Sequence, residues 1–278
     1  MRVLQSSWQD ATGTSIHTQD WETDGRPRAV VAVVHGLGDH IARYAEVGET
    51  LTRAGFTLMG FDLRGHGRSG GRRGHTPSYE TFLQDVDEQL GRIRAKHPRA
   101  PIFLYGHSMG GGIVLNYALR RRPKLKGIIA TSPWLRRAAR TPPLKEALAR
   151  FLEPILPTYT ENWGVTAQQL SRDPSAIRSY EGDDLAHGLV TVSTYRGCLV
   201  AGEWALAHAS EFSLPLLLMH GTADPNTSWE ASREFAESAG RKCRLRLWDG
   251  AYHELHHETM RKQVLGLMVR WMNGRLET

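Results

Sequence analysis

The sequence predicts an α/β domain in which a mostly parallel, doubly wound sheet is interrupted by a mainly helical insertion, called the cap below. Two observations carry this prediction. Short β-branched runs alternate with helical segments in the front half, as in a parallel sheet with helices on both faces. A long segment without a clean strand follows before the alternation resumes. The 278 residues, 40% hydrophobic and 23% charged, suffice for one large α/β domain or two small ones.

The front half supplies the first strands and helices of the predicted sheet. Residues 3–22 alternate loosely about a turn at Thr12-Gly13, which predicts a β-hairpin. The run Ala29–Val34 is apolar throughout, as expected for a strand buried on both faces. Ser78 precedes a segment with helical spacing and suits an N-cap. The other expectations are strands at 57–61, 101–105 and 127–130 and helices at 44–54, 78–96 and 113–119.

The alternation stops between residues 134 and 213, where prolines separate short helical stretches. We interpret this segment as a cap whose apolar side chains cover a site at the carboxyl ends of the strands. The predicted division is therefore a core at 1–133, the cap at 134–213 and the rest of the core at 214–278. The resumed pattern predicts strands at 214–219 and 243–248 and helices at 229–238 and 260–271.

The positive charge, formally +6, is dispersed and does not predict a nucleic-acid partner. A solvated surface is the favoured interpretation, and attraction toward anionic lipid surfaces or acidic substrates is the alternative. None of the densest groups of cations alternates with aromatic residues; these groups are Arg72-Arg73, Arg120-Arg121-Arg122 and Arg136-Arg137 with Arg140.

Cysteine usage and hydropathy favour a cytoplasmic protein. Cys198 and Cys243 are too few for a disulfide framework or a four-cysteine zinc site, and are expected as free thiols. No apolar run approaches the roughly 18 residues that a membrane span needs. The start Met1-Arg2-Val3-Leu4 is not followed by an apolar signal region, so we expect no export.

The strongest chemical motif is GHSMG at residues 106–110, which places Ser108 between a predicted buried strand and a predicted helix. A serine on such a sharp turn must adopt a strained backbone, and side chains two residues before or after it would collide. Glycine at 106 and 110 meets this demand. We expect Ser108 to be a catalytic nucleophile.

A serine nucleophile needs a general base and an acid that orients it. In this topology the chain order is serine, acid, histidine, each partner following a late strand. Asp224 follows the strand at 214–219, and His253 follows the strand at 243–248. Asp249 is the second choice for the acid because it lies close to its strand end and to His253. His220 is expected to be a buried structural histidine.

The remaining requirement is a pair of N–H donors for the oxyanion. Met109, after the nucleophile, supplies one, and Leu37, in the glycine-rich loop after the first buried strand, supplies the other. That loop contains neither G-x-G-x-x-G nor G-x-x-x-x-G-K, which argues against a nucleotide site. The catalytic residues already account for the loops that carry the histidines, and we expect no metal and no cofactor.

From about residue 30 to 271 the chain resembles the monoacylglycerol lipase and lysophospholipase group of the α/β-hydrolase superfamily. The resemblance rests on HGLGDH at 35–40 with Arg43-Tyr44, DLRGHGRS at 62–69, GHSMGG at 106–111, HGTAD at 220–224 and GAYHELH at 250–256. It implies the α/β-hydrolase fold, the triad Ser108, Asp224 and His253, and Leu37 and Met109 as oxyanion donors.

The resemblance also implies a polar pocket for glycerol hydroxyls. The matching positions are Asp39, Arg43, His107, Tyr180 and His256. The family often has Glu where this chain has Asp39, whose shorter carboxylate holds glycerol less directly.

The expected activity is hydrolysis of monoacylglycerol to fatty acid and glycerol through an acyl-enzyme. The alternatives are a lysophospholipase, which the cations at 136–140 favour, a broad-specificity carboxylesterase, an aminopeptidase and a non-hydrolysing ligand receptor. Ser108 argues against enzymes that need an aspartate nucleophile. The expected partner is a lipid ester, with transient contact to a membrane surface or lipid droplet through the cap.

Overall fold

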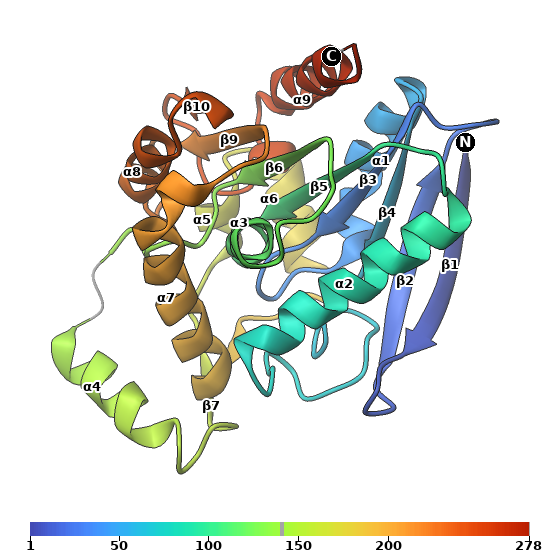
Figure 1. Ribbon diagram of the computed structural model, residues 1–278. Helices are drawn as coiled ribbons and strands as arrows, with labels where there is room; N and C mark the ends of the chain where they lie inside the picture. The colour runs from blue at the N-terminus through green and yellow to red at the C-terminus, as the bar shows by residue number, and fades with distance from the viewer. Residues whose placement is uncertain (140–141, 278) are drawn as a thin grey trace.

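An eight-stranded sheet with helices on both faces organises the molecule (Figure 1). The computed structural model describes residues 1–139 and 142–277. The strand order is β1-β2-β4-β3-β5-β6-β9-β10; β1 and β2 pair antiparallel, as do β2 and β4, and the rest pair parallel. The strands are β1 (Arg2–Gln9), β2 (Ser15–Glu22), β3 (Ala29–Val34), β4 (Phe56–Phe61), β5 (Ile102–His107), β6 (Gly127–Thr131), β9 (Leu216–Gly221) and β10 (Cys243–Trp248).

Two apolar layers enclose the sheet because its central strands are apolar on both faces. Within β3, Val30 packs into one layer and Val31 into the other, as the period of two in a strand requires. Helices α1 (Ala45–Arg53) and α9 (Arg261–Leu276) cover one face. Helices α2 (Tyr79–Lys96), α3 (Met109–Arg121) and α8 (Trp229–Ala239) cover the other. Short 3-10 helices occupy η1 (Ile41–Tyr44), η2 (Ala209–Glu211), η3 (Gly240–Lys242) and η4 (Leu255–His257).

These elements confirm the predicted order of hairpin, strands and helices. Ser78 caps α2 as expected, accepting a hydrogen bond from the Thr81 N–H at 3.3 Å. Helix α3 begins at Met109, four residues earlier than predicted. Its first turn contains Gly110, Gly111 and Gly112, which weaken the helical pattern in the sequence but let the helix lie close to the sheet. A Cβ at Gly110 would lie 2.1 Å from the carbonyl oxygen of Val34.

The insertion leaves the sheet after β6 and returns at β9, its neighbour in the sheet. It contains α4 (Pro143–Leu152), α5 (Ala167–Leu170), α6 (Pro174–Glu181) and α7 (Val192–Ala207). The prediction of no strand here was wrong, because β7 (Thr160–Asn162) pairs antiparallel with β8 (Leu189–Thr191). Three residues are too few to show an alternating pattern. Helix α4 projects from the body at the lower left of Figure 1.

No helix among the described residues has both the length and the hydropathy needed to cross a membrane.

Candidate active site

Ser108 sits on the sharp turn between β5 and α3. Its backbone has φ of +55° and ψ of −119°, a conformation that is strained for a residue with a side chain. A Cβ at Gly106 would lie 2.3 Å from the Gly110 carbonyl oxygen. Both flanking glycines are therefore needed to hold the serine hydroxyl out from the sheet.

The three residues expected to form the triad are in hydrogen-bond contact. His253 Nε2 lies 2.8 Å from Ser108 Oγ, and His253 Nδ1 lies 2.7 Å from Asp224 Oδ2. The contact arises because β5, β9 and β10 are parallel, so that the segments after them meet at one edge of the sheet. Asp249 accepts a hydrogen bond from Thr222 Oγ1 at 3.2 Å, on the exposed side of this loop, and is not brought to His253.

Asp224 is held by more groups than the sequence indicated. His220 Nε2 donates to Asp224 Oδ2 at 3.0 Å, and Thr227 Oγ1 donates to the same oxygen at 2.8 Å. His220 is fully buried as expected, but its contact with Asp224 was missed, since nothing in the spacing signals it. The two donors fix the carboxylate opposite His253.

Mutual charge stabilises the Asp224–His253 pair. Burial raises the pKa of Asp224, but the charge of His253 and the hydrogen bond from His220 outweigh burial and hold the pKa well below its usual range. Burial lowers the pKa of His253, but the Asp224 carboxylate more than compensates, so that this pKa lies above its ordinary value of 6.5.

The loop after β3 passes directly beside the serine. A Cβ at Gly36 would lie 3.1 Å from Ser108 Cβ, and Leu37 lines the cavity above the serine. Met109 is the first residue of α3, so its N–H has no carbonyl partner one turn earlier. The structure thus brings both expected oxyanion donors to the serine.

His35 holds the peptide that carries the Leu37 N–H, a contact that the sequence analysis missed. The Leu63 N–H donates to His35 Nε2 at 2.8 Å, so the ring proton is on Nδ1 and is donated to the Gly36 carbonyl at 2.8 Å. The Gly36 carbonyl and the Leu37 N–H lie on opposite sides of one planar peptide. Holding the carbonyl therefore turns the N–H away from His35.

A cavity, called the catalytic cavity below, opens beside Ser108. Four of the five residues expected in a polar pocket line it, namely Asp39, Arg43, His107 and Tyr180. Glu254, which the sequence analysis did not single out, lines it as well. The Arg43 guanidinium lies 5.0 Å from the Tyr180 ring centroid, which links the core to α6 of the insertion.

The fifth expected residue, His256, does not reach this cavity. Its fully buried ring stacks on Tyr44, with centroids 4.8 Å apart and planes 20° apart, and meets the edge of His107 at 4.8 Å. Among the described residues neither ring nitrogen has a hydrogen-bond partner. The expectation that His256 contacts glycerol is corrected to a packing position behind His107.

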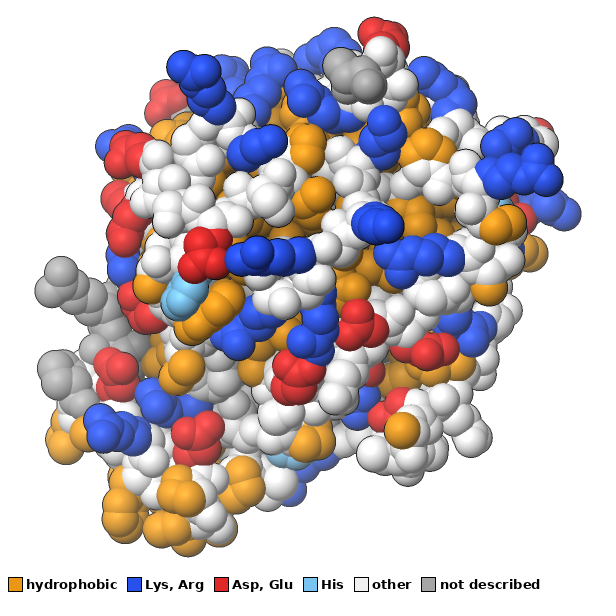
Figure 2. Space-filling model, viewed as in Figure 1, with side chains coloured by type: hydrophobic (Ala, Val, Ile, Leu, Met, Phe, Trp, Pro, Cys, Tyr) orange, Lys and Arg blue, Asp and Glu red, His pale blue; other side chains and the backbone are white. Residues whose placement is uncertain are grey.

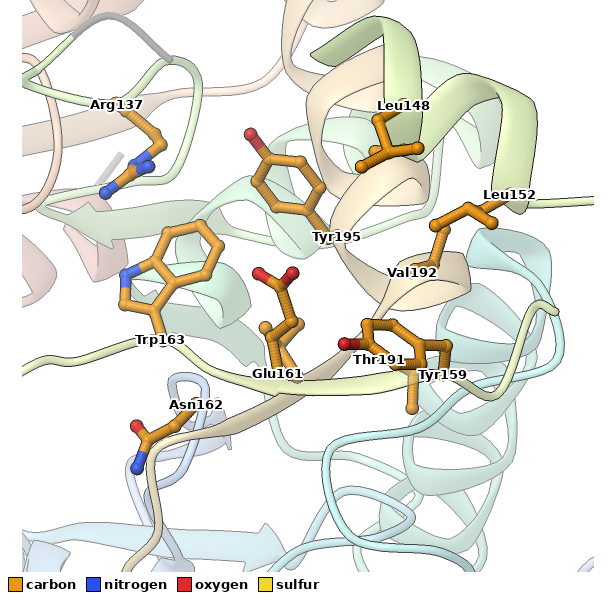
Figure 3. A pocket seen from close by; sticks show the side chains of 12 residues that line it. Arg137, Leu148, Leu152, Tyr159, Glu161, Asn162, Trp163, Thr191, Val192 and Tyr195 are labelled. Atoms are coloured by element: carbon orange, nitrogen blue, oxygen red, sulfur yellow. The ribbon is translucent and has the colours of Figure 1, made fainter. Parts of the chain in front are cut away.

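A second cavity, the α4 cavity, lies within the insertion and shares Trp163 with the first (Figure 3). Figure 3 shows Trp163, Tyr195 and Val192 around this space, with Leu148 and Leu152 reaching it from α4. Most of the lining is apolar or aromatic; its full set is Arg137, Leu148, Ala149, Leu152, Tyr159, Glu161, Asn162, Trp163, Val190, Thr191, Val192 and Tyr195.

Within residues 1–139 and 142–277, no three His, Cys, Asp or Glu side chains form a group suited to a metal ion.

The sheet order, the strained serine turn and the positions of the three segments at one sheet edge are those of the α/β-hydrolase fold. Residues 25–260 match the family model described as serine aminopeptidase, S33, and the chain belongs to this family.

The relatives of the chain include named lipases. The monoacylglycerol lipase of Mycolicibacterium smegmatis is 31% identical over 275 residues, which cover 98% of each chain. The crystal structure of Paleococcus ferrophilus monoacylglycerol lipase has a TM-score of 0.85 at 32% identity and covers 99% of this chain and 100% of that one. An uncharacterized abhydrolase domain-containing protein of Dictyostelium discoideum is 32% identical over 95% of this chain, which spans 28% of that protein's length.

Proposed function

We propose that the protein is a serine hydrolase of lipid carboxylic esters that converts monoacylglycerol to fatty acid and glycerol. The observation that carries the proposal is the Ser108–His253–Asp224 chain of hydrogen bonds, at 2.8 and 2.7 Å, beside a cavity with a polar end and next to a second, mostly apolar cavity that shares Trp163 with it. Kinship with proteins named monoacylglycerol lipase supports the substrate class.

The hydrogen bonds of the triad assign each of its residues a role in the reaction. Ser108 Oγ attacks the ester carbonyl carbon while His253 Nε2 takes its proton, and Asp224 stabilises the resulting imidazolium. His253 then gives the proton to the departing glycerol oxygen, which leaves an acyl ester on Ser108. Water, deprotonated by His253, cleaves that ester and releases the fatty acid.

Two backbone N–H groups hold the oxyanion formed in each step. They belong to Leu37, turned by His35, and to Met109 at the start of α3. The dipole of α3 adds positive potential at the same point. Removing one such donor typically costs about 10²–10³ in rate.

The two cavities orient an amphiphilic substrate. The glycerol end fits the polar end at Asp39, Arg43, His107 and Tyr180, where hydroxyls find acceptors and donors. The acyl chain passes Trp163 into the α4 cavity, which is mostly apolar. Residues 134–213 then act as the cap of this site.

Lysophospholipase or broad carboxylesterase activity is the second candidate. The cations at 136–140 favoured it, but Arg136 is paired with Glu203 and Glu234, and Arg140 lies outside the described residues. Arg137 remains; it lies over the Trp163 ring at 4.4 Å and lines the α4 cavity, away from the glycerol end.

The cap also offers a surface for a lipid membrane. Exposed apolar side chains on and after α4 form what we call the α4 patch: Leu144, Leu148, Phe151, Ile155 and Leu156. In Figure 2 it is the orange group at the lower left. Leu144 is 82% exposed, and Leu148 belongs to both the patch and the α4 cavity, so a lipid at the patch has a direct route inward. Peripheral contact of a cytoplasmic protein with membranes or lipid droplets is part of this proposal.

Vesicle co-sedimentation tests the patch. Leu144→Ser with Phe151→Ser should lower binding to phosphatidylcholine–phosphatidylglycerol vesicles about tenfold, because apolar burial drives it. Val3→Ser is the matched control, since Val3 is exposed on β1 far from α4 in Figure 1. Equal binding of all three proteins would contradict the membrane contact.

A substrate panel tests the activity. It contains monoacyl-, diacyl- and triacylglycerols, lysophosphatidylcholine and p-nitrophenyl esters, each with wild type and Ser108→Ala. The expected result is Ser108-dependent hydrolysis with the highest kcat/KM for monoacylglycerol. Preference for lysophosphatidylcholine or short esters would keep the serine hydrolase and overturn its substrate.

A further inference from the structure

Ser132, the first residue after β6, has a backbone conformation that is strained for a residue with a side chain. Its φ is +45°, in the left-handed region that favours glycine. Among the described residues, only Ser108 and Arg122 also have a positive φ without being glycine. Ser108 carries the nucleophilic hydroxyl, and Arg122 ends α3, where a left-handed residue is common. Neither explanation applies to Ser132, and a strained residue of this kind points to a function.

The hydroxyl of Ser132 contacts the backbone of the general base. The side chain is fully buried, and its Oγ donates to the carbonyl oxygen of His253 at 2.7 Å, across 121 positions of the sequence. Within the part of the chain that the structure describes, the only other donor to this carbonyl is the N–H of Leu255 in the same loop, at 3.1 Å. Ser132 is itself fixed to the sheet, because its N–H donates to the Met219 carbonyl of β9 at 2.8 Å. The hydroxyl therefore ties the His253 backbone to the sheet.

The segment around Ser132 also holds the nucleophile. The Ser108 N–H donates to the Thr131 carbonyl at 3.0 Å, and the Trp134 N–H donates to the Ser108 carbonyl at 2.8 Å. Both backbone polar groups of the nucleophile thus bond to residues that flank Ser132. One short segment sets the backbone positions of Ser108 and His253 at the same time.

We propose that Ser132 is a positioning residue that holds the His253 imidazole at hydrogen-bond distance from Ser108. Its hydroxyl fixes the backbone from which the imidazole projects, and its neighbours fix the backbone of the nucleophile. The distance of 2.8 Å between His253 Nε2 and Ser108 Oγ then depends on this segment. Ser132 does not line the catalytic cavity, so it acts through His253 and not on the substrate. This inference rests on the proposed serine hydrolase and adds a residue to its machinery.

Two substitutions separate the hydroxyl from the strained backbone. Ser132→Ala removes the hydroxyl and keeps a side chain at positive φ. Ser132→Gly also removes the hydroxyl, but glycine adopts this backbone without strain, so its thermal midpoint should lie above that of Ser132→Ala. Ser193→Ala is the matched control. Ser193 is a buried serine on α7 whose Oγ donates to the Thr76 carbonyl at 2.8 Å, and it does not line the catalytic cavity.

The measurement is the pH profile of kcat/KM for p-nitrophenyl butyrate in wild type and the three variants. On the plateau above the midpoint, both Ser132 variants should lower kcat/KM about 10- to 100-fold, because a displaced imidazole takes the Ser108 proton less readily. The two losses should be equal despite the different thermal midpoints. Ser193→Ala should match wild type.

The midpoint of the pH profile distinguishes positioning from a loss of folded enzyme. Burial lowers the pKa of His253, and the Asp224 carboxylate, 2.7 Å from Nδ1, raises it, with smaller contributions of the same sign from Glu254 and Asp39. If the His253 backbone moves, the contact with Asp224 lengthens, and the midpoint in both Ser132 variants should fall by about 0.5 pH unit. A smaller folded fraction lowers the rate at every pH and leaves the midpoint unchanged.

The outcomes separate this inference from the proposed function. If wild type cleaves the soluble ester but no monoacylglycerol, the lipid substrate is wrong, and the test of Ser132 is unaffected. If both Ser132 variants keep the kcat/KM and the midpoint of wild type, the role of Ser132 is wrong, and the hydrolase stands. A loss in Ser132→Ala that Ser132→Gly does not share would show that only backbone stability is at stake, and would also overturn the inference. If wild type cleaves no ester, both proposals fail.

Discussion

The catalytic cavity beside Ser108 and the α4 cavity share Trp163, but different kinds of contact hold their walls in place. Ion pairs and hydrogen bonds from loops of the core hold the first, as in the contacts of Arg43 with Asp39 and Glu254. Rings and aliphatic side chains of the insertion surround the second. Under the proposed function, the difference teaches that the core supplies the chemistry and most of the polar contacts for the leaving group, whereas the insertion supplies Tyr180 and the space for an acyl chain.

The two regions are joined by hydrogen bonds rather than by apolar packing alone. The His187 N–H of the insertion donates to the Gly38 carbonyl at 2.9 Å, and His40 Nε2 lies 2.7 Å from Asp183 Oδ2. Gly38 belongs to the loop that carries Leu37. We therefore expect a change in the insertion at this point to shift the loop that carries Leu37.

The largest effect is expected from a substitution that removes the nucleophile of the catalytic cavity and leaves the α4 cavity unchanged. Ser108→Ala should lower kcat by about 10⁴–10⁶ on esters of every chain length, since it removes the hydroxyl that contacts His253 Nε2. Its thermal midpoint should equal or exceed that of wild type, because the strained turn keeps its packing. Activity within tenfold of wild type would contradict the assignment of the nucleophile.

The next largest effect is expected from removing the charge of Asp224 beside His253. Asp224→Asn should lower kcat about 10⁴-fold, because the amide cannot stabilise the imidazolium. In wild type, kcat/KM should rise with pH as His253 loses its proton, with a midpoint above 6.5 because Asp224 raises the pKa. In Asp224→Asn the His253 ring stays buried but loses the neighbouring negative charge, so the midpoint of the pH profile should fall. Profiles from pH 5 to 9 on a soluble ester measure both values.

A substitution at Gly38, where the insertion contacts the core, tests whether the two regions are coupled. Gly38 has φ of +72°, and a Cβ there would lie 1.8 Å from the His187 carbonyl oxygen. Gly38→Ala should therefore displace the Leu37 loop and lower kcat about 10- to 100-fold. Gly13→Ala is the control, because Gly13 has φ of +81° with nothing within 4 Å of the added Cβ. It should cost about 1–2 kcal/mol of stability and no activity. Equal activity in the two variants would contradict the coupling.

The smallest effect concerns the α4 cavity alone. Val192→Trp should narrow this cavity and lower the ratio of kcat/KM for oleoylglycerol to that for butyrylglycerol about tenfold, with the short ester unaffected. Val200→Trp, on the same helix but 56% exposed, is the control. If Val192→Trp weakens both esters equally, the α4 cavity does not hold the acyl chain.

Sequence reasoning reached the parts of the site that depend on local pattern. Ser108 was found from glycine spacing and strand–helix context, and Asp224 and His253 from their places after late strands. The contacts of His220 and His35 were missed because they join residues whose proximity depends on how the loops fold. His256 was placed in the polar pocket by the family resemblance alone, whereas the structure packs its ring between Tyr44 and His107. The β7–β8 pair escaped since its strands are three residues long and lie far apart in the chain.

The most direct test of the central claim is labelling with a serine-directed fluorophosphonate, followed by peptide mass spectrometry, with and without 1-oleoylglycerol. We predict that the phosphonyl mass is found on the peptide containing Ser108 and that 1-oleoylglycerol slows the labelling. Label on another residue, or labelling of Ser108 at a rate that monoacylglycerol does not change, would contradict the account.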